Sequence, residues 1–100
     1  GRCTLTRIGR KEFLSIIHGR AVIAFLSRWC ISCKRVYRLL KKTGAYIVDI
    51  EQEPLLAEAF RVLGVPVIVC FQNGKEIYRR NGVCSRKQIS EILKIKMPDG

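Results

Sequence analysis

The sequence predicts an α/β fold in which a central five-stranded mixed sheet is flanked by four helices. Apolar runs suited to strands alternate with segments whose apolar residues recur at helical spacing, giving the order β-α-β-α-β-α-β-β-α. Strands joined through helices favour parallel neighbours with right-handed crossovers. Asn73-Gly74 predicts a tight hairpin that makes the last two strands antiparallel. Helices are therefore expected on both faces of the sheet.

The N-terminal segment is predicted to hold a short edge strand and a first helix. Cys3 and Leu5 indicate the strand, and Thr6 is the expected N-cap of the helix. The inward side of this helix is predicted to carry four apolar residues, Phe13, Leu14, Ile16 and Ile17. Gly19 is expected to end it, with His18 in its last turn in a structural role.

The second strand and helix are the clearest elements of the pattern. The unbroken apolar run 21–26 suits a strand that is buried on both faces. Four residues then recur at helical spacing, namely Cys33, Val36, Tyr37 and Leu40. Lys41 and Lys42 complement the C-terminal end of this helix, and Gly44 is expected to stop it.

A third strand, 45–50, leads to a helix that is predicted to begin at Pro54. Its apolar stripe is expected to consist of Leu55, Leu56, Ala59, Phe60 and Leu63. Val65-Pro66 opens the strand 67–71, which the hairpin joins to the strand 75–79.

A capping box at the end of the chain predicts the fourth helix. Ser85 and Gln88 have the required spacing of three residues. The residues expected to face inwards are Ile89, Ile92 and Leu93. Residues 97–100 are predicted to be a frayed tail.

Two cysteines stand where the second strand is expected to become a helix. Cys30 is predicted at the helix N-terminus, where unpaired N–H groups and the positive end of the dipole favour a thiolate over a thiol. Arg28, Lys34 and Arg35 add positive charge. Cys33 lies one turn further in, close enough to close a disulfide ring. This asymmetry suits a two-step exchange, in which one sulfur attacks a target disulfide and the other resolves the mixed disulfide.

Two other interpretations of the cysteine pair compete with redox chemistry. A zinc site needs four ligands, and the remaining candidates are scattered without a second close pair: Cys3, His18, Cys70 and Cys84. Alternatively, both cysteines are inert and behave as small apolar residues. Redox chemistry without a metal or bound cofactor is the favoured hypothesis.

Composition limits the class of protein. A chain of 100 residues with 48% apolar and 27% charged residues predicts one globular domain spanning residues 1–100. No apolar run approaches the roughly 20 residues of a membrane helix. Five cysteines, an odd number, suit a reducing compartment, so we expect a cytoplasmic monomer. The first residue is not Met, which leaves room for a removed leader or tether.

The net charge of +11 raises the question of an acidic partner or nucleic acid. The basic residues are spread from Arg2 to Lys96 without a long run and without interleaved aromatic residues. We therefore interpret the charge as a solvated basic surface, and a nucleic-acid partner is not expected.

The motifs Trp29-Cys30-x-x-Cys33-Lys34, Gly64-Val65-Pro66-Val67, Asn73-Gly74 and Gly82, together with the order of elements, resemble the thioredoxin family from about Gly19 onwards. The resemblance implies reduction of disulfide-containing protein substrates, with Cys30 as nucleophile and Cys33 as resolving thiol. It implies no bound cofactor and an electron donor similar to thioredoxin reductase. It also implies a cis peptide bond before Pro66 and pairing of the Val65 backbone with an extended substrate segment. The apolar lip around the nucleophile would comprise Trp29, Ile31, Val65, Pro66, Gly82 and Val83.

Two departures from the family pattern affect the expected chemistry. Ile31-Ser32 replaces Gly-Pro between the cysteines, which removes a rigid constraint and frees a backbone N–H. Ala24 and Ile47 occupy the positions of a buried acid and a nearby lysine. Without the acid, Cys33 lacks a proton acceptor, so a slower resolving step is predicted. The positive charge near the nucleophile is expected to raise the reduction potential above that of thioredoxin, about −270 mV.

Two other functions remain in competition with the reductase. One is an oxidase or isomerase that works outside the cytoplasm, which the altered dipeptide and missing acid permit and the extra cysteines disfavour. The other is a non-catalytic module that uses the basic surface to bind an acidic partner. Cys84, two residues after Gly82, is expected to be an ordinary buried cysteine, with a regulatory thiol as the alternative.

Overall fold

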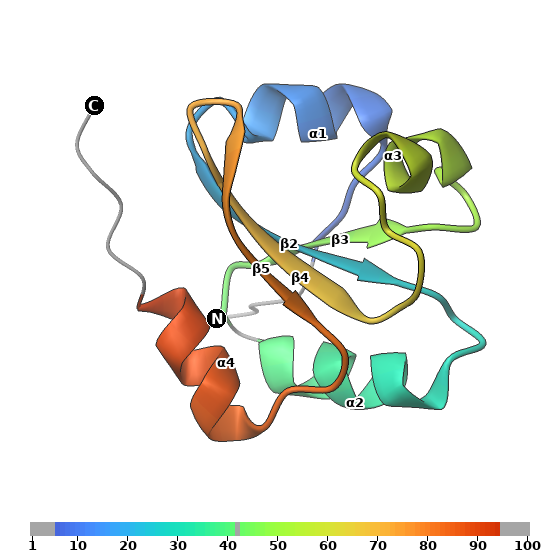
Figure 1. The fold of residues 1–100 in the computed structure, drawn as a ribbon, viewed down its shortest axis with the longest axis vertical. Helices are drawn as coiled ribbons and strands as arrows, with labels where there is room; N and C mark the ends of the chain where they lie inside the picture. The colour runs from blue at the N-terminus through green and yellow to red at the C-terminus, as the bar shows by residue number, and fades with distance from the viewer. Residues whose placement is uncertain (1–5, 42, 95–100) are drawn as a thin grey trace.

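The computed structural model describes residues 6–41 and 43–94. Figure 1 shows a sheet between two pairs of helices, with α1 and α3 on one face and α2 and α4 on the other. The elements are β1 (Thr6–Arg7), α1 (Arg10–Ile16), β2 (Arg20–Leu26), α2 (Ile31–Leu40), β3 (Tyr46–Asp49), α3 (Pro54–Ala59), β4 (Val67–Gln72), β5 (Lys75–Asn81) and α4 (Arg86–Leu93). The α/β class, the mixed sheet and the four helices are confirmed.

The sheet has the strand order β1-β3-β2-β4-β5, and its edge strand β1 comprises only two residues. β1 and β2 both pair with β3 in parallel, whereas β4 pairs antiparallel with β2 and with β5. Asn73 and Gly74 both have positive φ angles, 55° and 80°, as the predicted tight hairpin requires. β2 is the central strand, and most of its side chains are buried.

Each face of the sheet has its own apolar core. Beneath α2 and α4 the core includes Cys33, Val36, Ile89 and Ile92. Beneath α1 and α3 it is built around aromatic rings. Phe13 lies with its ring centroid 6.2 Å from Phe25, 5.1 Å from Phe60 and 5.4 Å from Phe71. All three pairs meet edge to face, the arrangement that aromatic quadrupoles favour.

The first helix begins later than predicted. Thr6 lies in β1, and the N-cap is Gly9, whose N–H donates to Glu12 Oε1 at 3.0 Å. The Ile8 N–H donates to the Ile47 carbonyl at 2.8 Å, so pairing with β3 keeps the chain extended up to the glycine. The short helix then turns Phe13 inwards but leaves Leu14 45% exposed, so the predicted burial of Leu14 was wrong.

The residues after α1 follow the prediction more closely. Ile17 is buried at the C-cap and Ile16 is half-buried. His18 lies in the turn after the helix rather than in its last turn, and the Gly19 N–H donates to the Ile16 carbonyl at 3.2 Å. The predicted strand at Cys3 and Leu5 lies outside the described residues, as do Lys42 and the tail 97–100.

The third helix ends earlier than its apolar pattern suggested. Leu56 and Ala57 are buried and Phe60 is half-buried, but the predicted stripe residues Leu55, Ala59 and Leu63 are exposed. Arg61 adopts a positive φ of 55°, which turns the chain out of the helix before Leu63. Arg79 of β5 donates hydrogen bonds to the Phe60 and Arg61 carbonyls and so satisfies groups left unpaired by this early end.

Two predicted helix-start signals are confirmed. Pro54 occupies the first turn of α3. Ser85 and Gln88 form the predicted capping box. Gly44 does not stop α2 as predicted, because the helix ends at Leu40 with Lys41 as its C-cap, and Gly44 lies further along the chain with a φ of 82°. Within the described residues, no helix is long and apolar enough to cross a membrane.

The aromatic core predicts a large difference between two neighbouring residues. Phe13→Ala should lower the free energy of unfolding by about 3–5 kcal/mol, because it leaves a cavity among three other rings. Leu14→Ala should cost less than about 1 kcal/mol, because that side chain is largely solvated. Urea titration of both variants measures the difference. Equal losses would contradict the assignment of Phe13 to the core and Leu14 to the surface.

Candidate functional site

Cys30 is the N-cap residue of α2, as predicted. The buried strand β2 ends at Leu26, and the chain reaches the helix through a short turn in which the Cys30 N–H donates to the Ser27 carbonyl at 3.2 Å. The Cys33 N–H donates to Cys30 Sγ at 3.2 Å. The sulfur therefore takes the place of the hydroxyl or carboxylate oxygen that caps most helices.

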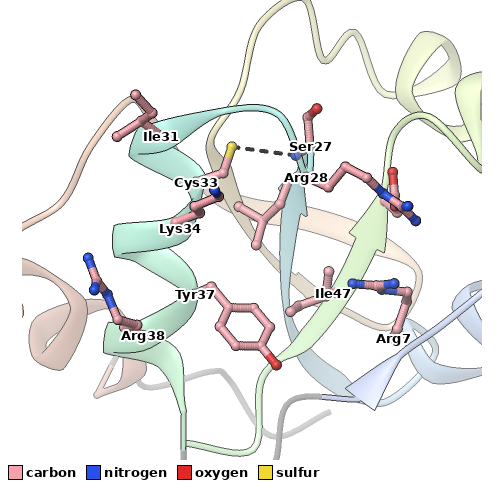
Figure 2. Close-up of a pocket in the computed structure, with 11 residues that line it drawn as sticks. Arg7, Ser27, Arg28, Ile31, Cys33, Lys34, Tyr37, Arg38 and Ile47 are labelled. Carbon is pink, nitrogen blue, oxygen red and sulfur yellow. Dashed lines mark hydrogen bonds and ion pairs between the residues drawn. The ribbon is translucent and has the colours of Figure 1, made fainter.

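Cys33 lies behind Cys30, in the first turn of α2, and is only 2% exposed. Its Sγ accepts a hydrogen bond from the Ser27 N–H at 3.4 Å, as Figure 2 shows. Burial, followed by the hydrogen bond with Cys30, raises the pKa of Cys33 to about 12. At neutral pH this inner sulfur is therefore a thiol.

The loop before β4 supplies the opposite wall of the site. The Val65–Pro66 peptide bond is cis, which confirms the expectation drawn from the resemblance. The Cys30 thiol lies 3.9 Å from the Val65 carbonyl oxygen, which is its acceptor. Gly82, with a φ of 88°, donates its N–H to the Pro66 carbonyl at 2.9 Å. Segments far apart in the sequence thus meet at the start of α2.

The six residues predicted to form an apolar lip differ in exposure. Trp29 and Ile31, which flank Cys30, are 78% and 83% exposed, and Val83 is also exposed. Val65 and Gly82 are half-buried, and Pro66 is buried. The outward apolar surface thus comes mainly from Trp29 and Ile31, and the cis-proline loop contributes chiefly its backbone.

On the side of the core, the surroundings of Cys33 are apolar. Ala24 and Ile47 are register partners in β2 and β3, both are buried, and both belong to the same core as Cys33. Neither can accept or donate a proton.

Asp49 is a charged residue of the site region that sequence reasoning did not single out. It is buried, and its Oδ2 lies 3.8 Å from Arg28 Nη2, while its Oδ1 accepts from the Glu51 N–H at 2.9 Å. Part of the Arg28 charge is therefore directed to this carboxylate and away from Cys30. An acidic residue at the end of an apolar strand was the available signal, but the pairing depends on the loop after β2.

Two further cysteines are buried, as expected. Burial raises the pKa of Cys70 to about 11 and also raises that of Cys84, although nearby arginines partly oppose both shifts. Cys3 lies outside the described residues. No group of three or more potential metal ligands gathers within residues 6–41 and 43–94.

The sheet order, a cysteine-capped helix and a facing cis-proline loop together define the thioredoxin fold with a dithiol at the start of α2. Comparison with known proteins agrees. The thioredoxin family model matches residues 5–95, so the chain belongs to the thioredoxin family of thiol-disulfide oxidoreductases.

Individual relatives are distant. A thioredoxin from Chlamydia trachomatis is 29% identical over 86 residues, which cover 79% of this chain and 84% of the relative. Chloroplastic thioredoxin X from Arabidopsis thaliana is 28% identical over 102 residues, covering 89% of this chain and 56% of that protein. The thioredoxin structure from Malassezia sympodialis superposes with a TM-score of 0.83 at 23% identity, covering 92% of this chain and 90% of the other.

The difference in burial between the cysteines predicts selective alkylation. Iodoacetamide at pH 7.5 should modify Cys30 in the folded protein while leaving Cys33, Cys70 and Cys84 as thiols, because burial shields them and raises each pKa. Peptide mass mapping identifies the modified positions, and the guanidine-unfolded protein, in which all should react, is the control. Alkylation of Cys33 at the same rate as Cys30 would contradict the described geometry.

Proposed function

We propose that the protein reduces disulfide bonds in other proteins by dithiol exchange, with Cys30 as nucleophile and Cys33 as resolving thiol. The observation that carries the proposal is the arrangement at the start of α2. Cys30 is half-buried rather than buried, and its sulfur accepts a hydrogen bond from the Cys33 N–H. The second sulfur, that of Cys33, lies in the first turn of the same helix. Negative charge on a sulfur is favoured at such a helix end.

The reaction proceeds in two exchanges. The Cys30 thiolate attacks one sulfur of the target disulfide, forms a mixed disulfide and expels the other target sulfur as a thiolate that takes up a proton. Cys33 then gives up its proton and attacks the Cys30 sulfur, which releases the second target thiol. The pair ends as a disulfide, having passed two electrons to the target. A partner dithiol reductase similar to thioredoxin reductase returns the electrons, and no resident cofactor is required.

The second exchange is the slower one in this proposal. Cys33 has a pKa of about 12, and its core neighbours Ala24 and Ile47 cannot accept its proton. The proton must instead pass to the departing target sulfur or to water. The mixed disulfide is therefore expected to be longer-lived than in family members that carry a buried acid.

Substrate binding is proposed to use the Val65 backbone and the exposed lip. The Val65 carbonyl already lies beside the Cys30 sulfur, where an extended substrate segment can pair with it. Trp29 and Ile31 offer apolar surface on the other side of the nucleophile. An exposed, extended segment with apolar residues next to its disulfide is the substrate class that fits.

The buried free thiols suit a reducing compartment, so the cytoplasm is the proposed location. The proposed form is a monomer.

An oxidase or isomerase acting outside the cytoplasm is the second candidate. Ile31-Ser32 and the lack of an acid at position 24 permit it, whereas the additional cysteines argue against it. A non-catalytic basic module is the third, favoured by the net charge of +11.

The reductase proposal predicts a specific effect of removing each sulfur. The wild-type protein should accelerate insulin reduction by dithiothreitol, and Cys30→Ser should abolish the acceleration. Cys33→Ser should retain the first exchange and accumulate mixed disulfides through Cys30, because the resolving sulfur is absent. Non-reducing mass spectrometry detects these adducts. Acceleration that persists in Cys30→Ser would overturn the assigned roles. Salt-dependent binding of an acidic partner, without any reduction of insulin, would favour the non-catalytic basic module.

Restoring an acid beneath the pair should speed the second exchange. Ala24→Asp is expected to raise its rate at least about tenfold, because a positioned base can accept the Cys33 proton. The same change should lower stability by roughly 2–5 kcal/mol, because it buries a carboxyl group. Ala24→Asn supplies similar size and polarity without a base. Stopped-flow decay of a preformed mixed disulfide measures the step, and equal rates in the Asp and Asn variants would refute the role of the missing acid.

A further inference from the structure

A pocket lies on the flank of α2, between this helix and the β3–β1 edge of the sheet, with a volume of about 350 Å³ (Figure 2). This is within the roughly 300–1,000 Å³ range of small-molecule sites. The residues that line it are Arg7, Leu26, Ser27, Arg28, Ile31, Cys33, Lys34, Tyr37, Arg38, Ile47 and Asp49. Cys30 and the cis-proline loop are not among them, but Ile31 of the apolar lip and the inner sulfur Cys33 are, so this pocket adjoins the proposed substrate surface without containing the nucleophile.

The inner wall of the pocket is apolar. Leu26 and Ile47 are buried on the sheet side, and Tyr37 projects from α2 toward Ile47. Ile47 makes this wall more apolar than the family pattern would, since that pattern has a lysine at the same position. The apolar part of a ligand that binds here leaves water and contacts aliphatic and aromatic side chains.

The rim of the pocket is cationic. Arg7 and Arg28 border it on the strand side, and Lys34 and Arg38 line it from the helix, although Figure 2 shows the end of the Arg38 side chain directed away from Tyr37. The single lining carboxylate, Asp49, lies 3.8 Å from Arg28. Within the part of the chain that the structure describes, the other three cations have no ion-pair partner.

We propose that this pocket binds a small amphipathic organic anion, with an aromatic or short aliphatic body against the inner wall and one acidic group at the cationic rim. The inner wall supplies affinity for the apolar body, and the charge excess at the rim selects an anion over a neutral molecule of the same shape. Because the Cys30 sulfur lies outside the pocket, binding does not depend on the proposed reductase activity.

A pair of fluorescent probes tests the proposal with the full chain. 8-Anilinonaphthalene-1-sulfonate carries a sulfonate on an aromatic body, and N-phenyl-1-naphthylamine is its neutral counterpart. The anionic probe should bind the folded protein at one site, at least about tenfold more tightly than the neutral probe at low salt. Replacing both Lys34 and Arg38 by Gln should weaken the anion about tenfold and leave the neutral probe unchanged, since exposed charges contribute modestly. Tyr37→Ala should weaken both probes.

Matched variants locate the site. Arg35→Gln removes a charge from the same helix at an exposed position that does not line the pocket, and should not alter binding. Cys30→Ser and Trp29→Ala should also retain it. Loss of binding in Trp29→Ala would place the probe on the apolar lip and overturn the proposal. So would equal affinity for the two probes, or an effect of Arg35→Gln as large as that of the rim variants.

Discussion

The hydrogen bond from the Cys33 N–H to Cys30 Sγ, 3.2 Å long, is the interaction on which the redox site depends. It forms because β2, the buried central strand, is joined to α2 by a short turn that ends at Cys30, the N-cap residue. Placing a cysteine at the N-cap gives its sulfur the role of an acceptor for an otherwise unpaired helix N–H. The second cysteine is carried into the core by the same turn.

The two sulfurs differ because of what surrounds each one. Cys30 lies beside the Val65 carbonyl and is flanked in sequence by two exposed apolar residues, whereas Cys33 belongs to the same buried core as Ala24 and Ile47. Burial stabilises Cys33 as a thiol, and its core neighbours Ala24 and Ile47 offer no proton acceptor. The same apolar residue at position 47 lines the pocket on the flank of α2. One helix therefore has a proposed protein-binding end and a proposed anion-binding side.

The sequence contained most of the information for elements set by local patterns. The apolar run of β2, the positive-φ turn at Asn73-Gly74 and the capping box at Ser85 depend on neighbouring residues, and each is found where it was expected. Thr6 did not cap α1, because pairing between β1 and β3 keeps the chain extended up to Gly9. That pairing joins segments some 40 residues apart, so local propensity could not reveal it.

Side-chain partners were harder to predict than backbone elements. Leu63 extends the apolar spacing of α3, but Arg61 turns out of the helix first. The ion pair between Arg28 and Asp49 joins the ends of two strands, and no pattern in either segment indicates it. Cys30 and Cys33 were predictable because their spacing is itself local. Their relation to Val65 came from family resemblance, since the loop is remote in sequence.

We propose that the hydrogen bond from the Cys33 N–H to Cys30 Sγ favours the dithiol over the disulfide. Equilibrating the Cys30/Cys33 couple against glutathione and quantifying both forms gives its reduction potential. We expect a value above that of thioredoxin, about −270 mV, because a hydrogen-bond donor that stabilises the reduced sulfur raises the potential. A value at or below about −270 mV would contradict it.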